Sequence, residues 1–198
     1  WYLELSSLIG DRTNLFAGQQ YHGYALTKAK DSIIVRPVIA WKGENLKVAL
    51  GAEGNVISDA IVTSDDVSVS DRMGYGLTTS WTQDALVINA NAARMDAEDE
   101  TDTTLGANLL WHNAGLGYIY AINDISSANL NNTSADFGNM VGKHTINTVY
   151  ASYKIPSVLD LDNFDIYLGA YWSQLNVDSA EVDNIDRYGG RVRFKYFF

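Results

Sequence analysis

The chain has 198 residues, of which 46% are hydrophobic and 12% aromatic, with 2 prolines, and this composition excludes a disordered or collagen-like protein. The net charge of -10 argues against nucleic acid as a partner, and the absence of cysteine excludes disulfides and thiol catalysis. No apolar run reaches the roughly 18–20 residues that a membrane-spanning helix needs. No signal peptide precedes Trp1, so we expect a mature or trimmed form.

Apolar and polar side chains alternate with a period of two along most of the chain, which predicts β-strands. The expected strands cover residues 1–9, 32–42, 46–62, 67–82, 85–97, 102–112, 115–125, 144–156, 164–177 and 186–198. We therefore expect one domain, residues 1–198, with ten strands. Twelve strands remain an alternative if residues 11–31 hold a further hairpin. Pro37 interrupts its strand, and we expect a bulge or kink there because proline cannot donate to the ladder.

The connections between these strands alternate in length. The short ones are residues 43–45, 83–84, 113–114 and 156–163, and the longer ones on the other side are 10–31, 64–66, 98–101, 126–143 and 178–185. Short turns on one rim and longer loops on the other are typical of a transmembrane β-barrel, with the short turns in the periplasm. With an even number of strands, both termini fall on the periplasmic side.

Tryptophans mark the ends of successive strands. Trp41, Trp81 and Trp111 each come just before a short turn. Aromatic side chains at the same end of successive strands are typical of the girdle at a membrane–water interface. A soluble barrel also alternates, but it has no reason to place tryptophan at the turns. We therefore predict an all-β protein, an antiparallel up-and-down transmembrane β-barrel.

The last residues carry a resemblance to a known group of proteins. Gly190 is followed by alternating hydrophobic residues, which are Val192, Phe194, Tyr196 and Phe198. This pattern resembles the C-terminal assembly signal of Gram-negative outer-membrane β-barrel proteins, and the chain looks like a small monomeric porin. The resemblance implies location in the cell outer membrane and insertion by the barrel assembly machinery. The partners it implies are the lipid bilayer, lipopolysaccharide and a small solute, with no nucleic acid.

The alternation also assigns a set of charged side chains to the lumen. These residues are Glu4, Arg36, Lys47, Glu53, Arg72, Lys154, Asp165, Arg191, Arg193 and Lys195. In a closed barrel the last strand pairs with the first, so we expect Glu4 to lie near Arg191–Lys195. Excess positive charge in a narrow pore lowers the barrier for anions. The expected function is thus a channel for passive diffusion of small hydrophilic, anionic solutes. The alternative for these residues is that the charges pair across the lumen and hold it shut.

Acidic residues gather in three of the longer loops. They are Asp59, Asp65, Asp66 and Asp71, then Asp96, Glu98, Asp99, Glu100 and Asp102, then Asp178, Glu181, Asp183 and Asp186. None has the ligand spacing of an EF-hand, so we predict no metal site. The alternative function is a closed outer-membrane barrel whose acidic loops, 64–66, 98–102 and 178–185, act in adhesion or partner binding.

Enzymatic chemistry has little support in the sequence. The histidines are His22, His112 and His144, and neither Gly-x-Ser-x-Gly nor His-Glu-x-x-His occurs. We predict that the protein is not an enzyme, with no catalytic residue and no cofactor.

Overall fold

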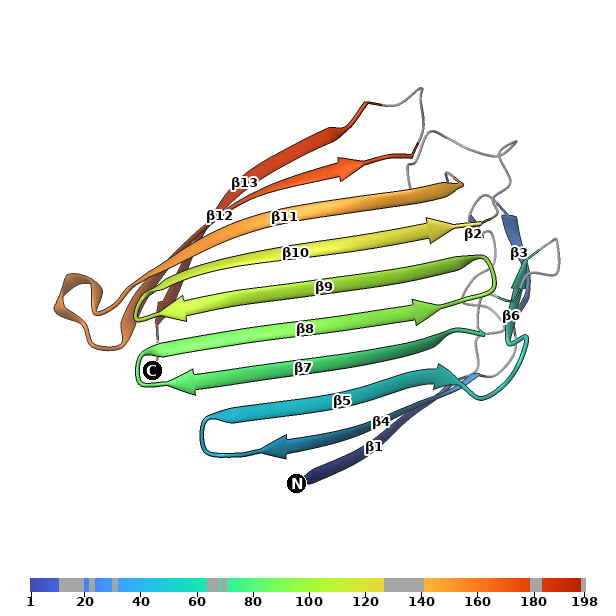
Figure 1. Cartoon of the computed structure of the whole chain (residues 1–198), viewed down its shortest axis with the longest axis horizontal. Helices are drawn as coiled ribbons and strands as arrows, with labels where there is room; N and C mark the ends of the chain where they lie inside the picture. Colours follow the sequence, from blue (N-terminus) through green and yellow to red (C-terminus); the bar gives the residue numbers. More distant parts are fainter. Residues whose placement is uncertain are drawn as a thin grey trace.

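The computed structural model describes residues 1–10, 20–21, 24–29, 32–63, 68, 71–126, 141–178 and 183–196. Ten antiparallel strands form one sheet in up-and-down order, which confirms the predicted fold class and number of strands (Figure 1). In sheet order the strands are β1 (Tyr2–Gly10), β4 (Ser32–Lys42), β5 (Leu46–Asn55), β7 (Met73–Gln83), β8 (Leu86–Asp96), β9 (Glu100–Trp111), β10 (Ala114–Ile125), β11 (Gly142–Ile155), β12 (Phe164–Asn176) and β13 (Ile185–Tyr196). A short 3-10 helix, η3 (Val158–Asp160), lies between β11 and β12. Among the residues that the structure describes, no helix is long and apolar enough to cross a bilayer.

A second sheet, of three strands, is separate from the ten-stranded sheet, which we call the wall. It consists of β2 (Gln20–Tyr21), β3 (Tyr24–Ala29) and β6 (Ile61–Thr63). The β2–β3 hairpin thus pairs with β6 and does not extend the main sheet, so the twelve-strand alternative is wrong.

The expected strand 46–62 was too long, because the chain turns after Asn55. The Asn55 Nδ2 donates to the Ile57 carbonyl at 2.8 Å, and its Oδ1 accepts from the Ile33 amide at 3.1 Å. An asparagine that bonds to the backbone two residues on stabilises a turn. This turn separates β5 from β6.

Two of the short connections are two-residue hairpin loops. The register pairs Gln83 with Leu86 and Trp111 with Ala114. The first loop residue of each has a left-handed backbone, with φ of 51° at Asp84 and 49° at His112. Tight hairpins need a positive φ to match the twist of the strands, and aspartate tolerates this region better than most residues.

Pro37 leaves a gap in one ladder without shifting the register. On one side of β4, Leu5 of β1 lies opposite Pro37. On the other side the pairing with β5 runs from Val35↔Gly54 directly to Val38↔Gly51, so no residue is inserted. The expected bulge is therefore absent from β4, and the proline is accommodated by pairs missing from the ladder.

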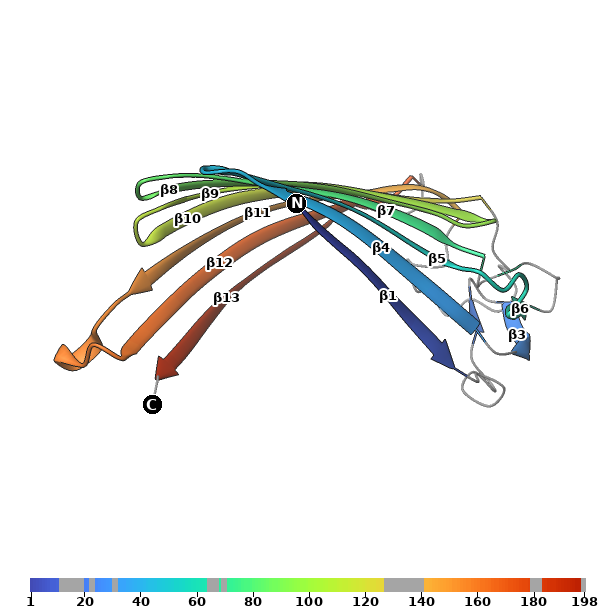
Figure 2. The same cartoon turned by 90° about the horizontal axis from the view of Figure 1, so that it is seen from below.

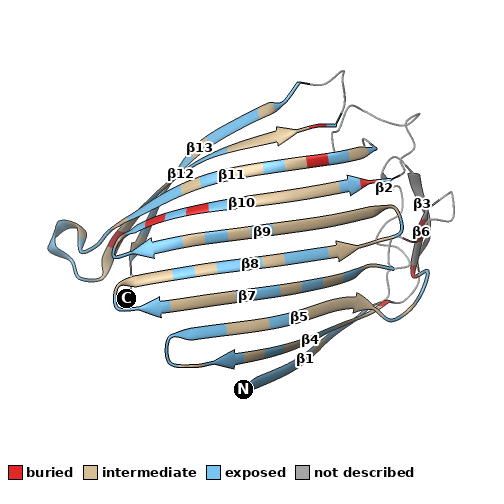
Figure 3. Cartoon of the chain, in the orientation of Figure 1, coloured by how far each residue is buried: buried red, intermediate tan, exposed pale blue. Residues whose placement is uncertain are grey.

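The sheet is bent into an arch, with β1 and β13 as its two outer strands (Figure 2). Few described side chains are buried, and most of the strand surface is exposed or half-buried (Figure 3). Large apolar side chains are among the exposed ones, including Leu105 at 48%, Trp111 at 59% and Phe194 at 66%. An apolar surface of this extent is what a lipid-facing wall presents.

The register separates two faces of the wall across its whole width. Because directly opposed residues of antiparallel strands point to the same side, one row defines each face. The apolar outer face contains the row Leu46, Trp81, Ile88, Leu109 and Leu116. The polar face contains the row Lys47, Ser80, Asn89, Asn108 and Gly117.

Candidate functional site: the polar face of the wall

The ten charged residues predicted for the lumen all belong to the polar face. Nine follow from the strand registers, and Arg72 comes directly before β7 and lines the same groove as Arg36 and Glu53. This groove has a volume of about 800 Å³ and extends from β4 to β9. The structure therefore brings these side chains to one surface.

Arg36 and Glu53 form an ion pair between β4 and β5. They lie next to the ladder gap at Pro37, where the backbone pairing between these strands is interrupted. Both side chains stay well exposed, so the pair contributes little to stability, and each charge remains open to solvent on the polar face.

Two carboxylates of β9 share one amide donor near the long-loop rim. The Asn123 Nδ2 donates to Glu100 Oε1 at 2.7 Å and to Asp102 Oδ1 at 2.5 Å. Arg72 is also in this region, with its Nη1 3.9 Å from the sulfur of Met95. The amide lets two like charges lie close together on the same strand.

The densest group of cations lies on β11–β13. Lys154 Nζ is 2.8 Å from Asp165 Oδ2, and Asp165 is only 5% exposed. Tyr167 donates to the same carboxylate oxygen at 3.4 Å. Directly opposite on β13, Arg193 lies across from Tyr167 and Lys195 across from Asp165. We call Lys154, Arg191, Arg193 and Lys195 the basic wing.

The uncharged polar-face residues of β8 and β10, together with Thr104–Asn108 of β9, form a neutral strip between the basic wing and the charges of β1–β7. On β8 and β9, Asn89 Nδ2 donates to Asn108 Oδ1 at 2.8 Å. The polar-face residues of β10 from Gly115 to Ala121 carry no charge. The charged lining is thus not one continuous stripe. Alternation reveals which face a residue occupies, but its place around the wall depends on strand order.

The expected neighbourhood of Glu4 and the basic wing stays a prediction. In the described residues β1 pairs with β4 alone, and β13 pairs with β12 alone, at opposite ends of the sheet. Glu4 accepts a hydrogen bond from the Tyr2 hydroxyl on its own strand. β1 and β13 are the two outer strands of the arch (Figure 2).

Comparison with known proteins identifies the family of this chain. The family model "Porin-like glycoporin RafY" matches residues 1–198. The chain belongs to this porin family. A solved structure, OccK5 (OpdH) of Pseudomonas aeruginosa, has a similar fold, with a TM-score of 0.52 and 15% sequence identity. The match covers 99% of this chain and 52% of the other, so the chain spans about half the length of that protein. No curated protein matches the chain.

Membership of the porin family places the protein in the cell outer membrane. The short-turn rim of this porin has the expected aromatic girdle on its outer face. Trp41, Trp81 and Trp111 lie at or near the ends of β4, β7 and β9. On the neighbouring strands, Phe164 packs against the rings of Phe194 and Tyr196, with centroids 6.5 and 6.4 Å apart. Phe198 lies outside the described residues.

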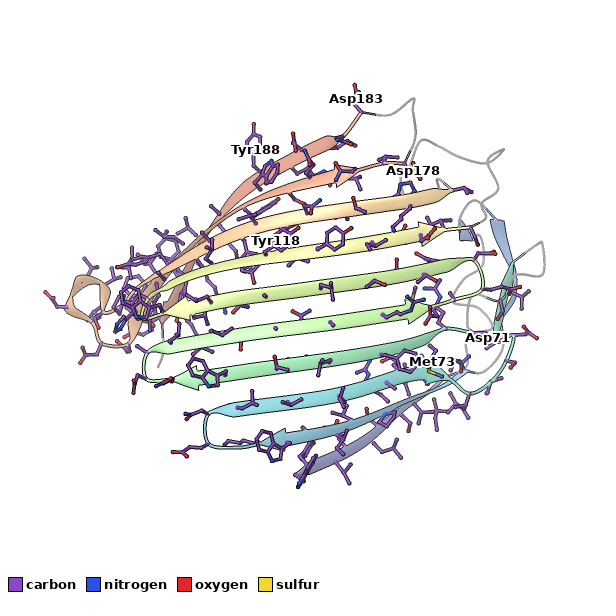
Figure 4. The ribbon with its side chains drawn as sticks, in the orientation of Figure 1. Asp71, Met73, Tyr118, Asp178, Asp183 and Tyr188 are labelled. Carbon is purple, nitrogen blue, oxygen red and sulfur yellow. The ribbon has the colours of Figure 1, made fainter. Side chains whose placement is uncertain are left out.

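The acidic clusters do not converge into one site in the described part of this porin. Asp96 pairs with Arg94 on the outer face at 2.7 Å, whereas Glu100 and Asp102 belong to the polar face. Asp71, Asp178 and Asp183 are spread along the long-loop rim (Figure 4). No group of three or more histidine or acidic side chains in the described residues could hold a metal ion. Asp65, Asp66 and Glu181 lie outside those residues.

The two described histidines of this porin, His112 and His144, lie near opposite rims. His112 is in a short turn, with its ring 5.0 Å from that of Trp111, and His144 is near the opposite rim. His22 lies outside the described residues. The porin family is a family of channels, and the absence of enzymatic activity in this chain stays a prediction.

Some residues of the polar face were not singled out by the sequence as part of the site. Arg187, on β13, lies opposite Ser173 of β12 and adds one more cation to the basic wing. Asn123 was missed because an isolated asparagine gives no signal until the register brings it to Asp102. Alternation alone puts Tyr150 and Tyr171 on the polar face, but only the strand order shows that they are neighbours.

Proposed function

We propose that this porin is a channel for passive diffusion of small hydrophilic solutes, with a preference for anions. The observation that carries the proposal is the basic wing on β11–β13, extended by Arg187. Four cations alternate along the polar side of β13 alone, and these are Arg187, Arg191, Arg193 and Lys195. A row of fixed positive charges along a pore attracts anions and raises the barrier for cations.

The charge of the polar face is opposite in sign to that of the whole chain, which supports this proposal. The chain has a net charge of -10. The strand registers nevertheless give the polar face more cations than carboxylates. The cations are Arg36, Lys42, Lys47, Arg72, Lys154, Arg187, Arg191, Arg193 and Lys195, and the carboxylates are Glu4, Glu53, Glu100, Asp102 and Asp165. Positive charge is thus concentrated where a solute would pass.

The neutral strip supports a solute that is hydrophilic but not strictly ionic. Asn89 and Asn108 offer amide donors and acceptors without charge. The matching family is described as a glycoporin family, and a polar neutral wall fits hydroxylated solutes. We propose that the basic wing biases the solute charge while the neutral strip provides passage.

The test is the reversal potential of single channels in a planar bilayer under a salt gradient. Arg191→Glu, on the polar face, should shift the reversal potential towards cation selectivity. Lys143→Glu is the matched control, because the register places Lys143 opposite Asp124 on the outer face. It makes the same change in net charge and should leave the selectivity close to that of the wild type. Equal shifts in both variants would contradict a role for the basic wing.

The alternative function, partner binding by the acidic loops, makes the opposite prediction. If it is correct, replacement of residues 64–66, 98–102 and 178–185 abolishes binding to cells or matrix, while the purified barrel shows no conductance. Contacts with lipopolysaccharide and the barrel assembly machinery remain part of the proposal for either function.

A further inference from the structure

We propose that Gly117 and Gly189 are positioning residues of the channel, because they seat the rings of Tyr150 and Tyr171 flat against the wall and so set the free space above it. This inference rests on the proposed function. It concerns the size of the passage, whereas the basic wing concerns its charge.

The four residues form one row across β10–β13. Gly117 lies opposite Tyr150, Tyr150 opposite Tyr171, and Tyr171 opposite Gly189. Directly opposed residues share a face, and the row continues through Asn108 to the neutral strip. The two tyrosines are therefore nearest neighbours on the polar face, each with a glycine on its far side.

The rings lean away from each other, each over its glycine. A Cβ added at Gly117 would overlap the ring of Tyr150, at 2.7 Å from its Cε1. A Cβ added at Gly189 would be 2.7 Å from Cε1 and 3.1 Å from Cζ of Tyr171. Real Cβ atoms essentially never come this close to another heavy atom, so any larger residue would displace the ring. Gly117 is buried, as is Gly115 on the same face of β10, whereas the residues between and beside them are exposed or half-buried.

Two other glycines of the same face, Gly76 and Gly169, have no ring above them. A Cβ added at Gly76 meets nothing within 4 Å, and one at Gly169 meets only the Ala151 carbonyl oxygen, at 3.9 Å. Glycine in a strand interior is unfavourable, so its use at positions 117 and 189 calls for a local reason. Close approach of an aromatic ring from the next strand is such a reason, and it recovers packing that glycine alone would lose.

The consequence for transport follows from the length of the tyrosine side chain. A tyrosine lying along the wall adds one ring thickness to the lining, whereas one standing upright extends towards the centre of the passage. Arg191 is two residues beyond Gly189 on the same face of β13, so an upright Tyr171 would stand beside its guanidinium. When the rings of Tyr150 and Tyr171 lie over Gly117 and Gly189, both the passage and the basic wing stay accessible to a solute.

The experiment compares single-channel conductance of Gly117→Ala with that of Gly169→Ala. We expect Gly117→Ala to lower the conductance and Gly169→Ala to leave it at the wild-type value. The Tyr150→Ala background provides the second half of a double-mutant cycle. In that background Gly117→Ala should have no effect, because no ring remains to be displaced. An equal loss of conductance with and without Tyr150 would overturn the inference, as would an unchanged conductance in Gly117→Ala.

A second readout needs no channel activity. Unfolding of the detergent-solubilised barrel in urea should show that Gly117→Ala lowers the midpoint when Tyr150 is present and not when it is alanine. If the wild-type barrel conducts poorly but the effect of Gly117→Ala on unfolding depends on Tyr150, the proposed function is contradicted and the packing of Tyr150 over Gly117 is supported. If the barrel conducts but the effect of Gly117→Ala does not depend on Tyr150, the proposed function is supported and the inference about Gly117 is contradicted.

Discussion

Lys154 Nζ lies 2.8 Å from Asp165 Oδ2, across the connection between β11 and β12. The two partners differ in exposure, since the Asp165 side chain is 8% exposed and that of Lys154 37%. A carboxylate this deep in the wall depends on its cation, whereas the lysine can turn its ammonium group to water. The buried Asp165 therefore holds Lys154, one residue of the basic wing, in place.

This asymmetry predicts unequal effects of breaking the pair. Lys154→Met should lower the urea midpoint of unfolding more than Asp165→Asn, because it removes the ammonium group that contacts the buried carboxylate. Lys47→Met, at an exposed lysine of the same face, serves as the control and should leave the midpoint unchanged. A larger loss for Asp165→Asn would contradict this account of the pair.

The amide of Asn123 should stabilise the wall by holding Glu100 and Asp102 together. Asn123→Ala removes a donor to two carboxylates, so we expect a loss of about 1–3 kcal/mol in the free energy of unfolding. Asn89→Ala removes an amide that donates to a neutral partner, Asn108, and should cost about 0.5–1.5 kcal/mol. Denaturant titration of both variants measures the difference, and a loss that is no greater for Asn123→Ala would count against the shared-donor arrangement.

The girdle tryptophans should lie at the membrane interface. In variants that retain one tryptophan, Trp41, Trp81 and Trp111 should be quenched more strongly by a lipid spin label near the headgroup than by one deep in the acyl chains. Leu105, exposed on the outer face in the middle of β9, gives the comparison, since a single tryptophan introduced by Leu105→Trp should show the opposite preference. Stronger quenching of Trp81 and Trp111 by the deep label would contradict the placement of the short-turn rim at the membrane interface.

The sequence predicted the ten strands of the main sheet and their two faces, because both follow from a local period of two. The turn after Asn55 was missed because it depends on hydrogen bonds to Ile57 and, from another strand, to Ile33. The apolar residues that follow continued the pattern and concealed the end of β5.

The site was predictable only as a set of residues on one face. Arg36 and Arg191 share that face by alternation, but they lie on strands separated by the neutral strip. Pairwise features such as Tyr150 over Gly117 require the register between neighbouring strands, which sequence periodicity does not fix. The prediction that Glu4 lies near the basic wing depends on pairing between the first and last strands, which the periodicity of a single strand does not determine.

The central claim is that the polar face lines a water-filled passage with a positive field. Single-channel conductance of the purified wild-type protein in a planar bilayer, with the reversal potential under a salt gradient, tests it most directly. The account predicts stable conductance steps and a reversal potential on the anion-selective side. A folded, membrane-inserted barrel that shows no conductance, or one that selects cations, would contradict it.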